Sequence, residues 1–328
     1  MKPDGSATRG PDAAPARPPL AWHEALLQGL MRLLARLPLP LLHGIGVAVG
    51  WAMRLLPNRQ RRNALINLAL CLPNQDPRTL IRLRNRHLLA LGRTYAELAW
   101  LWVRPPAAVL GLIREVRGGE LLQRPPGTGL IVLSPHLGAW ELAGLYLAAQ
   151  GPTAIFYKPQ RHLDDLIVAA RGRSGATLAP ITARGIRTLV AALQRGEYVG
   201  ILPDQSPRAD KGAVFAPLFG NPAWTMVLVN RLARRSGARV IFMFAERLPG
   251  RGGFRIHCRP APTGIDSADD GEAAAALNRG IEQCIACCPE QYLWAYRRFR
   301  RRPAGWPRIY TGGLGDRAAL ATAARVRG

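Results

Sequence analysis

Short, continuously apolar runs alternate with amphipathic stretches over residues 119–303, and this alternation constrains the possible folds most strongly. The runs occur in GLIVLSP, TAIFYKP, TLAPIT, YVGILPD and ARVIFMFAERL, while GIRTLVAALQRG between them has the period of a helix. A strand that is apolar at every position is buried on both faces, as in a parallel sheet covered by helices. The sequence therefore predicts an α/β domain over 119–303 with a mostly parallel central sheet flanked by helices.

The segments around this domain have different patterns. Residues 1–20 are rich in proline, alanine and glycine and have no apolar period, which predicts a disordered leader. Residues 58–118 repeat apolar side chains at spacings of three and four, so we expect a helical region there. Residues 304–328, which follow RRFRRRPAG, are expected to form a loose tail.

Residues 21–57 predict an N-terminal membrane-associated helical segment. A leucine-rich amphipathic stretch is followed by LPLPLLHGIGVAVGWAMRLL, which is close to the length of a membrane span. We expect an uncleaved anchor that either crosses the bilayer or lies in its interface, and a buried helical hairpin is the alternative. Gly46 and Gly50 form a small-xxx-small pair, on its own a weak indication of helix pairing. The basic residues that follow would hold the domain on the cytoplasmic side: Arg54, Arg59, Arg61 and Arg62.

The charge of the chain indicates an anionic partner. Lysine and arginine number 45 against 21 aspartate and glutamate residues, which gives a formal net charge of +24. Nucleic acid, an anionic membrane surface, a phosphorylated lipid or an acidic protein would each suit this charge. We expect no nucleic-acid partner, because the arginines are dispersed and the sequence has no helix-turn-helix, zinc finger or RNA-recognition motif.

Five cysteines, three of them in CIACC, predict neither a disulfide framework nor a metal site. The number is odd, and the Cys-x-x-Cys spacing has no second pair of ligands. We expect small core residues in a reducing compartment.

His136 and Glu141 are the candidate catalytic pair. His136 follows the apolar run GLIVLS, and LGAWELAGLYLAA then continues as a helix. Chemistry in parallel sheets gathers at the carboxyl ends of strands. A carboxylate that accepts the Nδ1 proton leaves Nε2 free to take a proton from a substrate hydroxyl. The sequence predicts His136 as general base and Glu141 as its orienter. No G-x-S-x-G motif supplies a nucleophile, and a packing histidine is the competing interpretation.

Further polar groups stand at comparable positions. Asp204 and Gln205 follow the apolar run YVGILP, and Arg171 and Arg173 lie in RGRSG beside a glycine. Each fits a turn carboxylate or a solvated arginine when taken alone. Together with His136 they favour a substrate-binding site.

HLGAWEL resembles the His-x4-Asp/Glu motif of bacterial lipid acyltransferases, in the glutamate form of the lipid A secondary acyltransferases (lauroyl/myristoyl type). Further similar stretches follow in order: RGRSG, LQRGEYVGILPDQSP, GAVFAPLFG, RLARRSGARVI and CCPEQYLWAYRRFRRRPAG. The resemblance covers roughly residues 25–305.

The resemblance implies roles for the same residues. His136 would be the general base and Glu141 its orienter, Arg171 matches an active-site arginine with Arg173 beside it, and Asp204 matches the aspartate of an Asp-Gln pair. It implies a bacterial inner-membrane protein with its catalytic domain on the cytoplasmic side. The implied reaction moves an acyl chain from acyl carrier protein to a hydroxyl of a lipid A precursor, with no metal or organic cofactor.

Two alternatives remain open. Ala139 stands where the family often has asparagine, and NPAWTMVLVN is a loose match to it. The identity of the acceptor lipid therefore stays open, and a glycerophospholipid, an aminolipid or another glycolipid is the alternative to a lipid A precursor. A non-catalytic membrane-bound scaffold is a different class, and a His136 variant that kept its cellular role would favour it.

Overall fold

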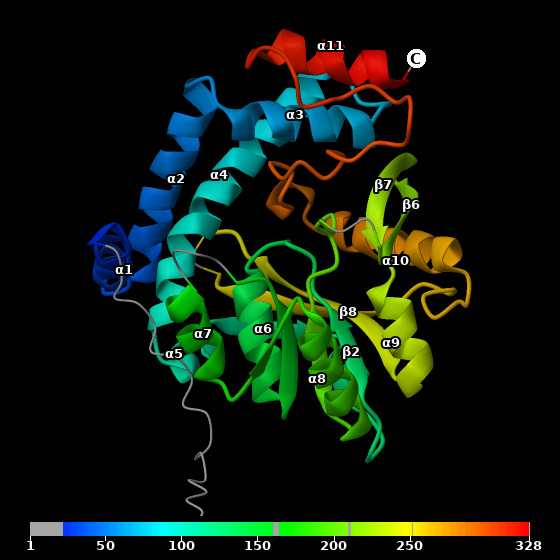
Figure 1. The fold of residues 1–328 in the computed structure, drawn as a ribbon. Coiled ribbons are helices and arrows are strands. Elements are labelled where there is room, and N and C mark those ends of the chain that lie inside the picture. The colour runs from blue at the N-terminus through cyan, green and yellow to red at the C-terminus, as the bar shows by residue number, and fades with distance from the viewer. Residues whose placement is uncertain (1–21, 160–163, 209–210, 251, 328) are drawn as a thin grey trace, which may run out of the picture.

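The computed structural model describes residues 22–159, 164–208, 211–250 and 252–327 (Figure 1). The predicted leader lies outside these residues. A seven-stranded sheet has the order β1-β9-β8-β2-β5-β3-β4. Its strands are β1 (Ile113–Arg117), β2 (Leu130–Leu133), β3 (Thr153–Tyr157), β4 (Thr177–Pro180), β5 (Tyr198–Ile201), β8 (Arg239–Arg247) and β9 (Phe254–Pro260).

The sheet is mostly parallel, as predicted. β8, β2, β5, β3 and β4 run in one direction, while β9 is antiparallel to β8 and β1 is parallel to β9. A separate hairpin pairs β6 (Ala213–Leu218) with β7 (Asn221–Met226). β1 lies inside the region expected to be helical. The sequence did not predict this strand because its half-exposed IREVR lacks the continuous apolar run of the inner strands.

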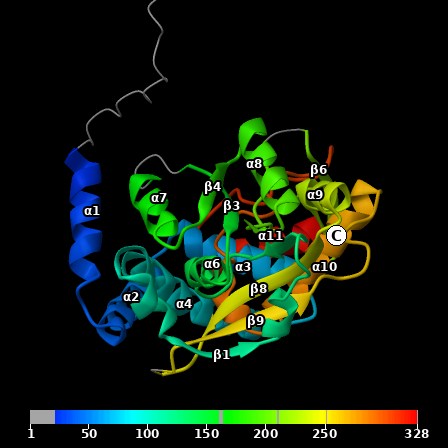
Figure 2. The same cartoon turned by 90° about the horizontal axis from the view of Figure 1, so that it is seen from below.

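Helices cover both faces of the sheet (Figure 2). Those that precede the central strands are α1 (Trp22–Leu34), α2 (Leu39–Leu55), α3 (Arg59–Cys71), α4 (Pro77–Val103) and α5 (Pro106–Leu110), with the short 3₁₀ turn η1 (Gly119–Leu122). The others are α6 (Trp140–Ala149), α7 (Asp164–Gly172), α8 (Ala183–Gln194), α9 (Leu228–Ser236), α10 (Asp270–Ile285), the 3₁₀ turn η2 (Pro289–Gln291) and α11 (Asp316–Arg327).

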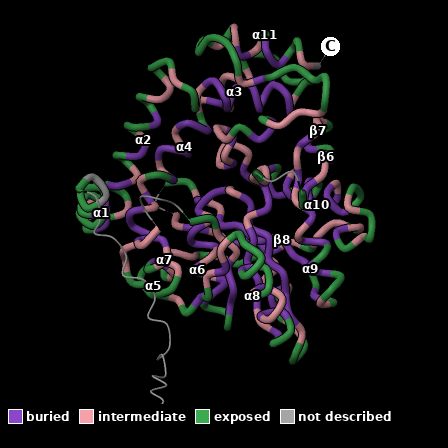
Figure 3. Tube along the Cα trace, in the orientation of Figure 1, coloured by how far each residue is buried: buried purple, intermediate pink, exposed green. Residues whose placement is uncertain are grey.

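β2 shows why its sequence is apolar throughout. Leu130 and Val132 pack into a core that includes Leu142 of α6, on one face of the sheet. Ile131 and Leu133 point to the other face, into a core that includes Leu189 of α8. All of β2 is buried, and Figure 3 shows the centre of the sheet around β8 as buried too. Each such side chain contributes about 1.5–3 kcal/mol when it leaves water.

Three glycines let α2 pack directly on α4. A Cβ added at Gly46 would lie 2.7 Å from Arg93 Cα, and one at Gly50 would lie 2.6 Å from the Leu88 carbonyl oxygen. On α4, a Cβ at Gly92 would lie 2.0 Å from the Gly46 carbonyl oxygen. The small-xxx-small pair therefore marks a helix contact inside this chain.

Among the described residues, no single helix has both the length and the hydropathy of a membrane span. α2 and α3 meet the criterion only as a pair, and they are bent by 77° where they join.

The C-terminal segment was expected to be a loose tail, and for residues 316–327 this is wrong. They form α11, which packs on α3 with Ala319 and Ala323 fully buried. Asp316 at its start binds Arg61 and Arg84 at 3.0 and 2.8 Å. The helix buries alanines, so its sequence lacks the large apolar residues that mark an amphipathic period.

Candidate active site

His136 and Asp204 meet at the carboxyl edge of the sheet. β2 pairs in parallel with β5, with Leu133 opposite Ile201. His136 follows Leu133 by three positions and Asp204 follows Ile201 by three positions, so the two chains leave the sheet in step. The Ser134 N–H donates to the Ile201 carbonyl at 2.9 Å and extends this pairing. The register of two buried strands therefore brings the two side chains together.

Asp204 holds the imidazole at Nδ1. Its Oδ1 lies 2.7 Å from His136 Nδ1, and its Oδ2 accepts the His136 backbone N–H at 3.0 Å. Burial raises the pKa of the Asp204 carboxyl, but the charge of His136 and the hydrogen bonds from it outweigh burial and lower the pKa. An ionised Asp204 accepts the Nδ1 proton and leaves Nε2 unprotonated, as a general base requires.

The sequence predicted Glu141 as the carboxylate that orients the His136 imidazole. The structure places Asp204 on Nδ1 instead, so this prediction is wrong. Glu141 lies in the first turn of α6 and pairs with Arg171 of α7, with distances of 2.6 Å to Nη2 and 3.0 Å to Nε. Burial raises the pKa of Glu141, but Arg171 above all, with Trp102 and His136, lowers it overall. The same carboxylate keeps the pKa of Arg171 above its usual value despite burial. Glu141 thus lies close enough to His136 for the two charges to interact, while its hydrogen bonds go to Arg171.

Gln205 completes the contacts of the imidazole. Its Nε2 lies 3.1 Å from His136 Nε2, so the amide donates to the nitrogen that would act as base. The Trp140 ring stands beside the imidazole, with the ring centroids 5.2 Å apart. A substrate hydroxyl that uses Nε2 has to displace the Gln205 amide or share the nitrogen with it.

Arg173 lies elsewhere. Its guanidinium donates to the carbonyls of Arg104 and of Leu101, the latter at 3.1 Å, at the C-terminal end of α4. Positive charge is favourable at that end of a helix. The structure therefore brings five of the predicted residues together: His136, Asp204, Gln205, Glu141 and Arg171. The side chain of Arg173 instead contacts the C-terminal end of α4.

The segment 289–293 supports the histidine turn, and sequence reasoning assigned it no role. The Leu293 N–H donates to the His136 carbonyl at 3.0 Å, and the Gly138 N–H donates to the Gln291 carbonyl at 3.1 Å. Gly138 has φ +62°, and a Cβ there would lie 2.0 Å from the Ala245 carbonyl oxygen, which explains the glycine of HLGAW.

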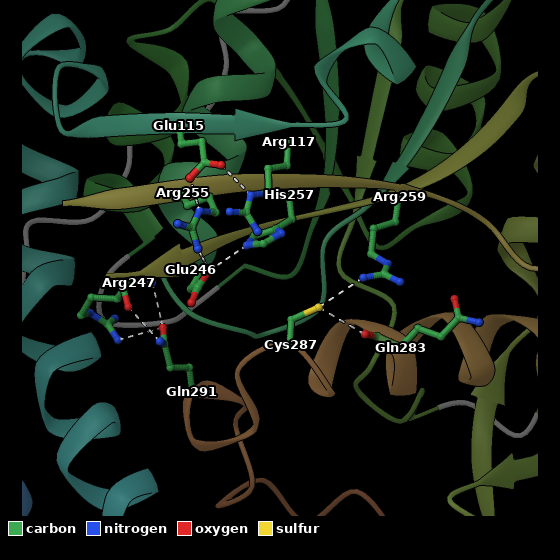
Figure 4. Close-up of polar contacts among 10 residues, drawn as sticks. All are labelled: Glu115, Arg117, Glu246, Arg247, Arg255, His257, Arg259, Gln283, Cys287 and Gln291. Atoms are coloured by element: carbon green, nitrogen blue, oxygen red, sulfur yellow. Dashed lines mark hydrogen bonds and ion pairs between the residues drawn. The ribbon is translucent and has the colours of Figure 1, made fainter. Parts of the chain in front are cut away.

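Gln291 holds this segment in place, and Tyr292 beside it is buried close to Asp204. Burial, and then the charge of Asp204, raise the pKa of the Tyr292 hydroxyl. The Gln291 side chain accepts the Arg247 backbone N–H and donates to the Arg247 carbonyl, both at 2.9 Å (Figure 4). The string PEQYLW was the available signal, since it is part of a stretch that resembles the family.

A small cavity of about 20 Å³ lies beside the Glu141–Arg171 pair. It is lined by Trp140, Glu141, Gly144, Leu145, Ile155, Arg171, Ser174 and Leu202. This volume holds about one water molecule. The cavity joins the charged pair to apolar side chains of α6 and β3.

Figure 4 also shows a second group of charged residues, on β1, β8 and β9. Glu115 binds Arg255, and Glu246 binds both Arg255 and His257 at 3.1 and 2.8 Å. Cys287, the exposed cysteine, accepts a contact from Arg259 at 3.3 Å, while the other four cysteines are buried. Partly exposed pairs of this kind contribute little to stability.

Comparison with known proteins matches nearly the whole chain to one family. The profile described as "Bacterial lipid A biosynthesis acyltransferase" matches residues 14–301. The chain is 31% identical over 296 residues to a lipid A biosynthesis palmitoleoyltransferase of Escherichia coli (strain K12), which covers 89% of this chain and 95% of that protein. A lipid A biosynthesis lauroyltransferase of the same organism is 29% identical, covering 89% and 96%. A myristoyltransferase is 26% identical, covering 76% and 78%. The chain therefore belongs to the bacterial lipid A biosynthesis acyltransferases.

Proposed function

We propose that this acyltransferase moves a fatty acyl chain from an acyl carrier protein thioester to a hydroxyl of a lipid A precursor, with His136 as general base. The observation that carries the proposal is the His136–Asp204 pair at the edge between β2 and β5. A buried, ionised carboxylate on Nδ1 supports base chemistry at Nε2. The names of the relatives, lipid A biosynthesis palmitoleoyltransferase and lauroyltransferase, support a fatty acyl chain as the transferred group and a lipid A precursor as the acceptor.

Each step assigns the proton to one atom. His136 Nε2 accepts the proton of the acceptor hydroxyl while the hydroxyl oxygen attacks the thioester carbonyl carbon. The tetrahedral intermediate then collapses, the carbon–sulfur bond breaks, and the imidazolium returns the proton to the leaving thiolate. Asp204 stabilises the imidazolium between these steps, and Glu141 adds a second negative field.

Arg171 supports stabilisation of the oxyanion. Its Nε and Nη2 are used by Glu141, which leaves Nη1, as far as the described residues go, for an oxygen of the substrate. The bidentate pair fixes the plane of the guanidinium before substrate arrives. Preorganised donors of this kind act most strongly in a site that excludes water.

We propose that α1 and α2 lie in the interface of the inner membrane, with the site on the cytoplasmic side. An apolar band along these helices is exposed; it consists of Trp22, Leu26, Leu30, Leu33, Leu41, Ile45, Val49, Trp51, Leu55 and Leu56. Trp22 is 79% exposed and Leu55 69%. An exposed apolar stripe with basic residues on the same helices is typical of interfacial helices.

Acyl transfer by purified protein tests the proposal. The wild type, His136→Ala and Asp204→Asn are incubated with acyl-[acyl carrier protein] and an under-acylated lipid A precursor, and the products are identified by mass spectrometry. We expect product with the wild type and almost none with His136→Ala. Transfer that survived His136→Ala would refute the base. Parallel assays offer a glycerophospholipid or an aminolipid as acceptor, and transfer to one of these without transfer to the lipid A precursor would refute the acceptor and keep the chemistry.

A further inference from the structure

A second pocket, of about 580 Å³, lies between the first turn of α3 and the segment that precedes α11. It is lined by Arg59, Arg62, Asn63, Arg297, Tyr310, Gly312 and Leu314. A volume of several hundred Å³ is typical of sites for small molecules and head groups. None of these lining residues belongs to the His136 site or to the cavity beside Glu141.

Arg62 lines this pocket and has a buried donor that no other described residue binds. The residue is 6% exposed, and its Nη2 donates to the Thr311 carbonyl. Its Nε is buried and has no hydrogen-bond partner within the described ranges. Burial, and then the charge of Arg297, lower the pKa of Arg62, so its positive charge has no compensating anion in this environment, as far as the structure describes it. A buried donor without a partner is costly, and an anionic oxygen would supply the partner.

The charges around the pocket are not balanced by carboxylates. The first turn of α3 contains no acidic residue and carries the positive end of the helix dipole. The nearby carboxylate of Asp316 is already bound by Arg61 and Arg84. Arginines at a helix N-terminus form a site that suits phosphate, whose oxygens accept several donors at once.

The surroundings of the pocket indicate a lipid as the source of that phosphate. Leu55 and Leu56, which end the apolar band of α2, are 69% and 63% exposed, and Arg59 follows three positions after Leu56. Leu314 lines the pocket itself and is also exposed. A band that enters the acyl region of a membrane would place the pocket at the level of the head groups.

We propose that the pocket formed by Arg59, Arg62 and Arg297 binds the phosphate of a phosphorylated lipid at the membrane surface. The inference deepens the proposed function, because it assigns a place to the phosphate of an acceptor of that class. It concerns binding, and it does not require that acyl transfer occurs. Arg297 lies four positions after Leu293, which holds the His136 carbonyl, so one segment connects the pocket with the catalytic turn.

Vesicle binding in the His136→Ala background tests the pocket separately from catalysis. The vesicles contain phosphatidylcholine with or without a minor fraction of phosphatidic acid, and inorganic phosphate is added as a competitor. Arg59→Gln with Arg297→Gln removes two exposed pocket charges and leaves Arg62 in place. Arg187→Gln with Arg235→Gln removes two exposed charges from α8 and α9 and is the matched control.

We expect phosphatidic acid to tighten binding of the parent protein, and inorganic phosphate to compete with it. In the pocket variant, the affinity for vesicles with phosphatidic acid should fall by about tenfold. The control variant should keep the affinity of the parent protein. If both double variants lost the same affinity for vesicles with phosphatidic acid, the gain would come from net charge, and the proposed pocket would be refuted. Competition by inorganic phosphate without any gain from phosphatidic acid would overturn the lipid as the source. Acyl transfer by the wild type is scored separately, so its failure would leave these outcomes unchanged.

Discussion

Asp204 holds His136 at two points, the ring Nδ1 at 2.7 Å and the backbone N–H at 3.0 Å. The two contacts fix the imidazole and the turn that carries it relative to each other. Glu141, the other buried carboxylate near the histidine, is bound by Arg171. The site therefore divides two roles between two carboxylates. Asp204 orients the imidazole of the proposed base, and Glu141 anchors the Arg171 guanidinium.

Asp204→Asn should lower kcat by about 10²–10⁴-fold and change KM little. An amide at this position can donate to Nδ1 and stabilise the tautomer that carries its proton on Nε2. The measurement is steady-state transfer from acyl-[acyl carrier protein] to the lipid A precursor. Glu120→Gln makes the same change at an exposed carboxylate and should retain activity. Wild-type kcat in Asp204→Asn would contradict the assigned role.

Glu141→Gln should lower the free energy of unfolding by about 3–5 kcal/mol, because Arg171 would remain as a buried cation without its partner. The double variant Glu141→Gln with Arg171→Met removes both charges and should recover a large part of this loss. Urea unfolding of the four proteins of this cycle measures the coupling. If the two single changes added up in the double variant, the pair would not be a coupled unit.

The sequence predicts the catalytic edge but not the pairing within it. His136 and Asp204 each follow a continuously apolar run, so their position at strand ends is readable. Which strands are neighbours is a long-range property, and β5 is inserted between β2 and β3 although it comes later in the chain. Glu141 is only five positions from His136, and that closeness in sequence favoured the wrong partner.

Two other differences have local causes. α11 buries alanines against α3, and alanine carries little signal for burial in a sequence pattern. Arg173 lies two positions after Arg171, but α7 ends at Gly172, so the two guanidiniums point to different elements. Patterns of apolar residues predict elements well, whereas contacts of polar side chains depend on where each helix ends.

His87 should make stability pH-dependent in the acid range. The ring is buried in α4, and burial lowers its pKa from 6.5 to about 4. The unfolded chain therefore binds this proton first as pH falls, so stability is full above pH 6.5 and is lost toward pH 4. The two pKa values correspond to a loss of about 3 kcal/mol. Urea unfolding across this range should show a flatter profile for His87→Leu, and an unchanged profile would contradict the assignment.

Gly46→Ala and Gly44→Ala should change stability in opposite directions. A Cβ at Gly46 would lie 2.7 Å from the Arg93 backbone, whereas one at Gly44, in the same helix, has nothing within 4 Å. Alanine has a higher helix propensity than glycine, so Gly44→Ala should stabilise by up to about 1 kcal/mol. Gly46→Ala should destabilise by about 1–3 kcal/mol through overpacking. Thermal unfolding compares them, and equal shifts would show that α2 does not pack on α4 as described.

Gly144→Leu should shorten the acyl chain that the enzyme accepts, if the cavity beside Glu141 is where that chain begins. Gly144 lines the cavity, and a Cβ there would lie 4.0 Å from Ile155 Cδ1, an ordinary contact, so the first carbon is accommodated and the rest of a leucine more than fills the space of about 20 Å³. Each methylene that loses its apolar surroundings costs about 0.8 kcal/mol, roughly fourfold in kcat/KM. Competition between acyl-[acyl carrier protein] donors of graded length gives the ratio of their kcat/KM values. Gly172→Leu places the same side chain in open space on α7 and should keep the wild-type ratio. An unchanged length preference in Gly144→Leu, with activity retained, would place the acyl chain elsewhere in the protein.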